Sequence, residues 1–371
     1  GGLAHLDNAG YAAFEPTRWP APAGGDNPAG GRQFSNGQFN TPDGRARFVA
    51  TRVAQNEPHR DEDRDLILNT GRIRDQWHTM TRTAKAPRLM THIAEPYVEM
   101  HPADAERHGL APDKLARVES EHGMMIGRVM ITERQRPGSV FAPMHGTRSY
   151  RQALRPAAVV TGDPDPVSGQ PQLKLTPVSV KPLGETWYGF AALRQRPKRI
   201  AADYWSMAQS RGGWRVEMAG NTEPGDWTEW ARNLFAIEDD TDLLAVHDDG
   251  ARRHRFAAFS GDALHAALFI EPRPVSINRG FTSDGLTGDF PSPSDRLRLL
   301  AGRPGADQPA PGAIVCSCFE VGANQIIVAI VGDNCLTVEA VGASLSAGTN
   351  CGSCRPDIQR IIHERTVKEA V

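Results

Sequence analysis

All five cysteines of the chain lie after residue 315, and four of them form two close pairs. Cys316 and Cys318 are separated by one serine, and Cys351 and Cys354 by Gly-Ser. A disulfide framework would spread its cysteines over a secreted fold, so this concentration indicates a local site and a reducing compartment. Four thiolates in two pairs predict a tail that folds around a soft metal centre.

Two kinds of centre suit this donor set, an iron–sulfur cluster and zinc. Structural zinc sites generally leave two to four residues between the ligands of each pair, whereas Cys316 and Cys318 have one residue between them. The spacing favours a cluster of iron and sulfide, and zinc stays open as the alternative.

Helical patterns surround the cysteine pairs. Apolar spacing and capping residues predict helices over Asn324–Val331, from Thr337 to Ser346, and over Asp357–Arg365. Helix N-termini and backbone amides close to an anionic cluster would stabilise its reduced state, and Gly352 would permit a close approach of the backbone. We therefore expect the metal centre to lie beneath helix ends.

Charge and hydropathy exclude several kinds of partner. The 42 basic and 44 acidic side chains are mixed along the chain and give a formal net charge of -2, so we expect no nucleic-acid partner. No stretch of 18 apolar residues is present, so we also expect no membrane partner. The concentration of the cysteines in one short tail favours the cytoplasm as the compartment.

At 371 residues, the chain is long enough for two or three domains. Short apolar runs separated by turns predict a β-barrel over residues 61–184, including one helix near His101–Gly109. Five of the seven tryptophans suggest a separate α+β domain over 185–302, without a catalytic motif. Its expected helices are Ile200–Ser210 and Thr228–Phe235. Residues 303–312 have the composition of a linker before the metal-binding tail at 313–371.

The segment Asn69–Thr83 places hydroxyls, an indole, an imidazole and arginines in a loop after an apolar run. Hydroxyls and amides can hold phosphate or pterin oxygens, arginine can pair with phosphate, and Trp77 can pack against a flat ring. A large anionic cofactor suits this loop. A buried polar loop whose Trp77 and His78 only bridge strands is the structural alternative.

Two family resemblances appear at this point. VCSCFEVG together with AIVGDNCLTVEAVGASLSAGTNCGSCRPDIQRII resembles the bacterioferritin-associated ferredoxin-like domain. That resemblance implies a [2Fe-2S] cluster on Cys316, Cys318, Cys351 and Cys354, with Cys335 left as an ordinary thiol. NTGRIRDQWHTMTRT, EPYVEMHPADAERHGL, GSVFAPMHG and DPDPVSGQPQLKLTPVSV resemble the dinucleotide-binding domain of the molybdopterin oxidoreductases, which implies a six-stranded double-psi β-barrel.

The second resemblance also implies contacts with a molybdenum bis(molybdopterin guanine dinucleotide) that is shared with other domains. The residues expected to bind it are Thr70, Gly71, Arg72, Trp77, His78, Thr79, Thr81, His145, Gln170 and Lys174. None of them is expected to be catalytic. The resulting fold is mixed and multidomain, with the barrel, the α+β domain and a small helical [2Fe-2S] domain.

YAAFEPTRWP, RQFSNGQFNTPDGRARF, WYGFAALRQRP and GGWRVEMAG extend the likeness to the assimilatory nitrate reductases, which implies that residues 1–60 end an upstream catalytic domain. In that family nitrate is reduced to nitrite at molybdenum, and ferredoxin or an NADH-dependent reductase subunit donates the electrons. The family also has an upstream four-iron cluster and a cysteine ligand to molybdenum, whereas this sequence has no cysteine before Cys316. We therefore expect a fragment or truncated product that is inactive alone. The alternatives are a stand-alone electron-transfer subunit and a zinc-stabilised interaction module.

Overall fold

The computed structural model describes residues 2–16, 34–48, 50, 61–152, 155–166, 168–238, 242–305 and 309–368. The chain divides into two compact units, Gly1–Glu57 and Pro58–Val371. The first unit contains the short helix α1 (Asn8–Ala12), whose N-cap Asp7 accepts a hydrogen bond from the Gly10 amide at 2.7 Å. No residue of α1 is buried, and the cysteines and the polar loop all belong to the second unit.

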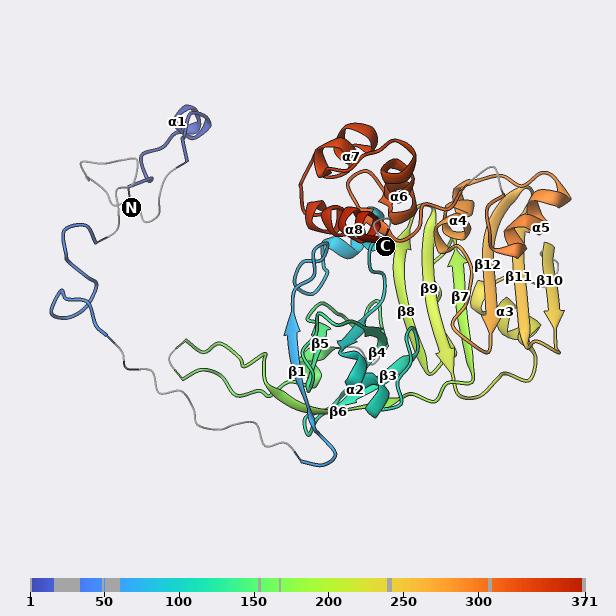
Figure 1. Ribbon diagram of the computed structural model, residues 1–371, viewed down its shortest axis with the longest axis horizontal. Coiled ribbons are helices and arrows are strands. Elements are labelled where there is room, and N and C mark those ends of the chain that lie inside the picture. The colour runs from blue at the N-terminus through green and yellow to red at the C-terminus, as the bar shows by residue number, and fades with distance from the viewer. Residues whose placement is uncertain are drawn as a thin grey trace. The chain divides into compact units, whose positions relative to one another are not determined.

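The second unit begins with a closed barrel of six strands in the order β1-β5-β2-β4-β3-β6 (Figure 1). The strands are β1 (Leu66–Gly71), β2 (Tyr97–Met100), β3 (Leu115–Glu119), β4 (Met124–Ile131), β5 (Ser139–Pro143) and β6 (Thr176–Pro182). The pairs β1/β5 and β2/β4 are parallel, and the other neighbours are antiparallel. The prediction of a closed six-stranded barrel is confirmed.

Alternating apolar residues of these strands fill the barrel, and Leu66, Leu68, Val118, Val140 and Val178 are all fully buried. The expected helix is α2 (Pro102–Arg107), which starts with proline at its first turn and is followed by Gly109 at φ 65°.

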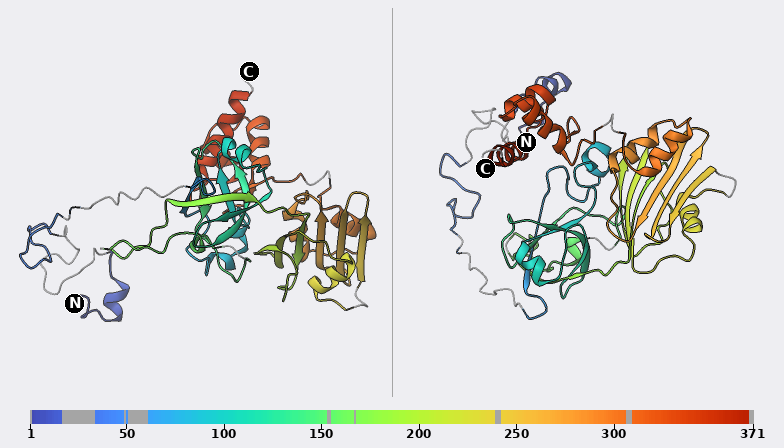
Figure 2. Two further views of the ribbon diagram at one scale, coloured as in Figure 1. Left: turned by 90° about the horizontal axis from the view of Figure 1, so that it is seen from below. Right: turned by 45° about the vertical axis from the view of Figure 1, so that its right-hand side comes forward.

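The middle part is one antiparallel sheet of six strands in the order β10-β11-β12-β7-β9-β8. Its strands are β7 (Trp187–Leu193), β8 (Tyr204–Ser210), β9 (Gly213–Gly220), β10 (Asp242–Asp248), β11 (Arg253–Ser260) and β12 (Ala263–Glu271). Helix α3 (Trp227–Phe235) covers one face, while α4 (Arg279–Asp284) and α5 (Pro293–Ala301) lie on the other (Figures 1 and 2). This arrangement confirms the expected α+β class.

The α3 side of the sheet collects all five tryptophans of the segment in one apolar cluster. Trp187 meets Trp227 and Trp230 edge to face, with ring centroids 5.2 and 5.8 Å apart. The Trp187 indole N–H donates to the Thr222 carbonyl at 2.8 Å, so its one polar atom is satisfied inside the core.

The expected helix at Ile200–Ser210 is wrong, because strand β8 occupies Tyr204–Ser210. Gly212 has φ 74° and lies in the tight turn that joins β8 to β9, where Ser210 pairs with Gly213. The β8 backbone pairs with β9 along its length, and this hairpin pairing overrides the helical spacing of its apolar residues.

The tail consists of a two-stranded ribbon and three helices around their own core. Its elements are β13 (Ile314–Cys316), β14 (Val321–Gly322), α6 (Ala323–Gly332), α7 (Val338–Leu345) and α8 (Arg355–Lys368). All three expected helices are confirmed, and the Thr337 hydroxyl caps α7 by accepting from the Ala340 amide at 3.1 Å. Among the described residues, no helix combines the length and apolar character needed to cross a membrane.

Candidate cofactor sites

Two short loops of the tail present the four paired cysteines. Cys316 ends β13, and Cys318 lies in the turn that leads to β14. Cys351 follows α7, and Cys354 immediately precedes α8. Each motif therefore contributes one buried sulfur, on Cys316 or Cys354, and one more accessible sulfur, on Cys318 or Cys351.

The sulfurs approach one another across the two motifs. Cys318 Sγ lies 3.5 Å from Cys351 Sγ, and the thiol of Cys316 interacts with that of Cys354. Asn350 Nδ2 donates to Cys318 Sγ at 3.3 Å, so a polar N–H group already points at one sulfur. Two sulfur pairs, each joining the two motifs, with an N–H group beside one of them, suit a [2Fe-2S] cluster.

The two cysteines of the second motif, Cys351 and Cys354, differ in their electrostatics. A hydrogen bond with the Ser353 hydroxyl, at 3.1 Å, is the main cause that lowers the pKa of Cys351, and Cys318 lowers it further. Burial raises the pKa of Cys354 to about 11, and the neighbouring Cys316 adds to the effect. The accessible sulfur is therefore the easier one to ionise.

Cys335 lies apart from this arrangement. It is buried in the connection between α6 and α7, and its Sγ lies 3.9 Å from the carbonyl oxygen of Asp333. Its contacts are those of an ordinary core thiol.

The polar loop begins where β1 ends, beside the end of the parallel strand β5. Thr70 is paired with Ala142, and the Met144 amide donates to the Gly71 carbonyl at 2.7 Å. The buried Thr70 hydroxyl donates to the Leu173 carbonyl at 2.8 Å. This bond holds the chain at Leu173 next to β1 and brings Lys174 to the same end of the barrel.

Gly71 leaves room for the Phe141 ring, which would have to move to admit a larger residue. A Cβ there would lie 2.8 Å from the Phe141 ring and 3.8 Å from Lys174 Nζ. The bare backbone of Gly71 and the exposed Lys174 ammonium thus share one corner of the barrel end. An anionic or carbonyl-rich ligand would meet a cation there.

His145 is almost fully buried, and both of its ring nitrogens are engaged by the loop. Nε2 accepts a hydrogen bond from the Ile73 amide at 3.1 Å, which leaves Nδ1 to donate to the His78 carbonyl at 2.7 Å. Burial lowers the pKa of His145, the bond to His78 opposes this, and the cation Arg151 lowers it further. His145 therefore positions the loop as a neutral imidazole and has no ring nitrogen left for a ligand.

The tip of the loop has buried residues that hold it against the protein and exposed residues that face solvent. Gln76 and Met80 are buried, and Gln76 Nε2 donates to the Leu89 carbonyl at 3.1 Å. The exposed residues of the loop include Arg72, Trp77, His78, Thr79 and Thr81, and Arg82 is exposed as well. Arg72 lies over the Trp77 ring at 5.4 Å and forms no ion pair with the described residues, so its charge is available to an anion.

Gln170 is the expected contact residue that the structure does not bring to this corner. It is exposed in the segment between residues 161 and 173, where Pro164 and Pro171 form an isolated bridge. Its backbone carbonyl accepts from the Asp165 amide at 2.8 Å, so its own hydrogen bonds stay within the segment.

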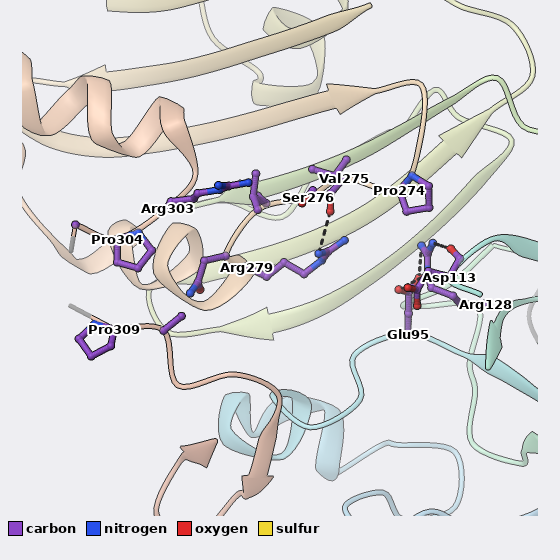
Figure 3. A pocket seen from close by; sticks show the side chains of 14 residues that line it. Glu95, Asp113, Arg128, Pro274, Val275, Ser276, Arg279, Arg303, Pro304 and Pro309 are labelled. Carbon is purple, nitrogen blue, oxygen red and sulfur yellow. Dashed lines mark hydrogen bonds and ion pairs between the residues drawn. The ribbon is translucent and has the colours of Figure 1, made fainter. Parts of the chain in front are cut away.

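A cavity of about 790 Å³ between the barrel and the middle sheet contains none of the expected contact residues (Figure 3). Three of its charged side chains, Glu95, Arg128 and Arg279, are engaged in ion pairs. Arg128 Nε lies 2.6 Å from Glu95, which also accepts from the buried Tyr204 hydroxyl at 2.8 Å, and Arg279 Nε lies 2.5 Å from Glu217. Ion pairs therefore engage most of the charge in this cavity, and Arg303 is an exposed cation in its lining.

Comparison with known protein families agrees with both sites. Residues 66–177 match the molydopterin dinucleotide binding domain, and residues 314–364 match the BFD-like [2Fe-2S] binding domain. The chain thus carries a molybdopterin dinucleotide-binding domain and a [2Fe-2S] domain of the bacterioferritin-associated ferredoxin type. This result favours the cluster over zinc in the tail.

The relatives of the chain include nitrate reductases. It is 35% identical to a nitrate reductase of Klebsiella oxytoca over 98% of this chain and 40% of that protein. It is 30% identical to a nitrate reductase of Shewanella frigidimarina over 64% of this chain and 27% of that one. It is 28% identical to the assimilatory nitrate reductase catalytic subunit of Bacillus subtilis over 49% of this chain and 26% of that protein. The chain therefore spans less than half the length of these relatives.

Proposed function

We propose that the chain acts as part of a molybdenum-dependent nitrate reductase. The observation that carries the proposal is the combination of a dinucleotide-binding barrel and a [2Fe-2S] tail in one chain that aligns over 98% of its length with a nitrate reductase. The overall reaction consumes nitrate, two protons and two electrons and gives nitrite and water. The electrons come from reduced ferredoxin or from NADH through a reductase subunit.

When bound, the molybdenum cofactor supplies two-electron oxygen-atom transfer and the cluster supplies one-electron transfer. The barrel's part is to hold and orient the dinucleotide. Lys174 and Arg72 would neutralise its anionic groups, Gly71 would allow close approach, and Trp77 would pack on a flat ring. Thr79, Thr81 and His78 are exposed beside them, while Thr70 and His145 hold the loop in place.

The proposal includes domain limits and a cellular setting. We place the dinucleotide-binding barrel at 61–184, the α+β domain at 185–302, a linker at 303–312 and the [2Fe-2S] domain at 313–371, with residues 1–60 ending an upstream domain. The relative from Bacillus subtilis is named as assimilatory, which supports a role in nitrate assimilation and, with the cysteine usage, the cytoplasm.

Nitrite formation by the complete enzyme that contains this chain tests the proposal. With reduced ferredoxin, or with NADH and its reductase, the wild type should form nitrite, and Cys351→Ser should lose this donor-driven activity. Reduced methyl viologen, a small electron donor, should still support nitrite formation by the variant if it reaches the molybdenum site directly. Equal donor-driven rates in both proteins would contradict the electron-relay role. Purification of the chain with a separate molybdenum-bearing protein would favour the second candidate, a stand-alone electron-transfer subunit.

A further inference from the structure

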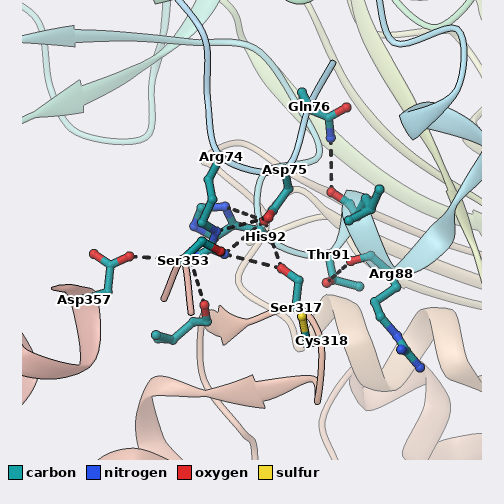
Figure 4. Close-up of polar contacts among 12 residues, drawn as sticks. Arg74, Asp75, Gln76, Arg88, Thr91, His92, Ser317, Cys318, Ser353 and Asp357 are labelled. Atoms are coloured by element: carbon teal, nitrogen blue, oxygen red, sulfur yellow. Dashed lines mark hydrogen bonds and ion pairs between the residues drawn. The ribbon is translucent and has the colours of Figure 1, made fainter. Parts of the chain in front are cut away.

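The polar loop of the barrel makes a second set of contacts, on the side of the cluster-binding tail (Figure 4). Arg74 Nη1 donates to the Val315 carbonyl at 2.8 Å, and Arg74 Nη2 donates to the Ser317 hydroxyl at 3.4 Å. Ser317 is the residue between Cys316 and Cys318. One guanidinium of the barrel therefore holds the first cysteine motif by its backbone and by its central side chain.

The same guanidinium also reaches the second cysteine motif. Arg74 Nη1 lies 3.5 Å from Asp357 Oδ2, in the first turn of α8, which starts directly after Cys354. Arg74 thus contacts the backbone next to Cys316 and the carboxylate that follows Cys354, so one side chain bridges the two cysteine motifs.

The carboxylate of Asp75 holds the Arg74 guanidinium in place. Asp75 accepts from Arg74 Nε at 3.1 Å and from the Ser317 hydroxyl at 2.9 Å, and its Oδ2 lies 3.1 Å from His92 Nδ1. The Arg74 and Asp75 side chains are 15% and 10% exposed, so their ion pair is largely shielded from water. A shielded pair with several partners fixes geometry more firmly than an exposed pair does.

We propose that Arg74 is a positioning residue that docks the [2Fe-2S] domain on the barrel's cofactor loop and raises the reduction potential of the cluster. Reduction adds one electron to a centre that four thiolates already make anionic, so a fixed cation beside it favours the reduced form. Arg72 and Trp77, two and three residues away in the same loop, are exposed on the dinucleotide side. The loop thereby connects the two cofactor sites of the chain. The proposal rests on the [2Fe-2S] assignment and not on nitrate as the substrate.

The test compares Arg74→Gln and Arg74→Lys with Arg88→Gln as the matched control. Arg88 is exposed, and its guanidinium points away from the network in Figure 4. The midpoint potential of the cluster is measured by a dithionite titration followed by electron paramagnetic resonance. Docking is measured by hydrogen exchange of the peptide that contains Val315 and Ser317.

Arg74→Gln should retain two irons per chain, shift the midpoint potential to a more negative value, and speed exchange of this peptide about tenfold, as expected when charge-assisted hydrogen bonds are lost. Arg74→Lys should have a midpoint potential close to the wild-type value, because it keeps the positive charge. Its peptide should exchange hydrogen faster than in the wild type, because lysine lacks the planar fork of the guanidinium. Arg88→Gln should match the wild type in both measurements. Unchanged potential and exchange in Arg74→Gln would overturn the proposal.

Asp357→Asn provides an independent arm if Arg74→Gln does not load the cluster. It removes a negative charge from the same network, so the midpoint potential should shift in the opposite, positive direction. A negative shift or no shift would contradict the electrostatic role. Absence of iron and sulfide from the wild-type chain would instead refute the cluster assignment, and with it the relay in the proposed function.

Discussion

The imidazole Nδ1 of His145 lies 2.7 Å from the carbonyl oxygen of His78, although 67 residues separate them in the chain. Nε2 of the same ring accepts from the Ile73 amide at 3.1 Å. One buried side chain, two residues after β5, therefore bonds to two points of the polar loop that follows β1. The shape of the loop depends on a residue outside it, and this dependence can be tested.

Replacement of His145 by alanine should destabilise the protein. The change leaves the Ile73 amide and the His78 carbonyl without their partner and opens a cavity, so we expect a loss of about 2 to 4 kcal/mol in the free energy of unfolding. Urea unfolding followed by circular dichroism measures it. His122→Ala, at an exposed position of the same barrel, is the control and should change stability by less than about 0.5 kcal/mol.

The depressed pKa of His145 predicts a pH dependence of stability. The unfolded chain binds this proton near the ordinary pKa of about 6.5, whereas the folded protein, mainly because of burial, binds it only at lower pH. Stability is therefore fully present above pH 6.5 and falls as the pH drops from there toward the folded pKa.

Unfolding free energies measured between pH 7.5 and 5.5 should decline less steeply in His145→Gln than in the wild type. His254 has a pKa that burial and His247 lower, and it contributes with the same sign, so some pH dependence will remain in the variant. Parallel pH profiles for the two proteins would show that His145 is not held neutral by the fold.

Trp77 offers a test of ligand binding that is separate from folding. Its side chain is 52% exposed at the tip of the loop, so Trp77→Ala should leave the melting temperature nearly unchanged. It should weaken binding of guanosine diphosphate, used as a probe for the dinucleotide, by about tenfold if the ring stacks on the ligand. Calorimetric titration measures this, and Leu336→Ala, at an exposed position of the tail, is the control. Equal affinity in all three proteins would remove Trp77 from the site.

The cysteines should separate into two classes on substitution. Cys316→Ser and Cys351→Ser should each lose most of the iron, because a two-iron cluster uses four protein ligands. Cys335→Ser should keep the iron and lose about 1 kcal/mol or more of stability, since a hydroxyl replaces a buried thiol in the helical core. Iron and sulfide analysis distinguishes the classes, and loss of the cluster from Cys335→Ser would place this residue among the ligands.

The tail could be predicted closely from the sequence because its signals are local. Cysteine spacing, the Thr337 cap and the apolar periods of three helices all act within a few residues, and the structure places each helix within two or three residues of its predicted start and end. The docking contacts of Arg74 could not be predicted in this way. Arg74 and Ser317 are 243 residues apart, and no local pattern signals that contact.

The barrel was predictable in class but not in the roles of its polar residues. Thr70 and His145 were expected to bind the cofactor, yet their polar atoms are occupied by Leu173, Ile73 and His78. The parallel pairing of β1 with β5 creates this arrangement, and pairing between distant strands is not visible in composition. Tyr204–Ser210 became a strand for a different reason, because it forms a tight hairpin with the strand that directly follows it.

The central claim is that one chain carries a dinucleotide-binding barrel and a redox-active two-iron cluster. The most direct measurement is the iron, zinc and acid-labile sulfide content of anaerobically purified protein, together with its visible spectrum before and after dithionite. We predict two irons and two sulfides per chain and a visible absorption that bleaches on reduction. One zinc per chain with no sulfide would contradict the account.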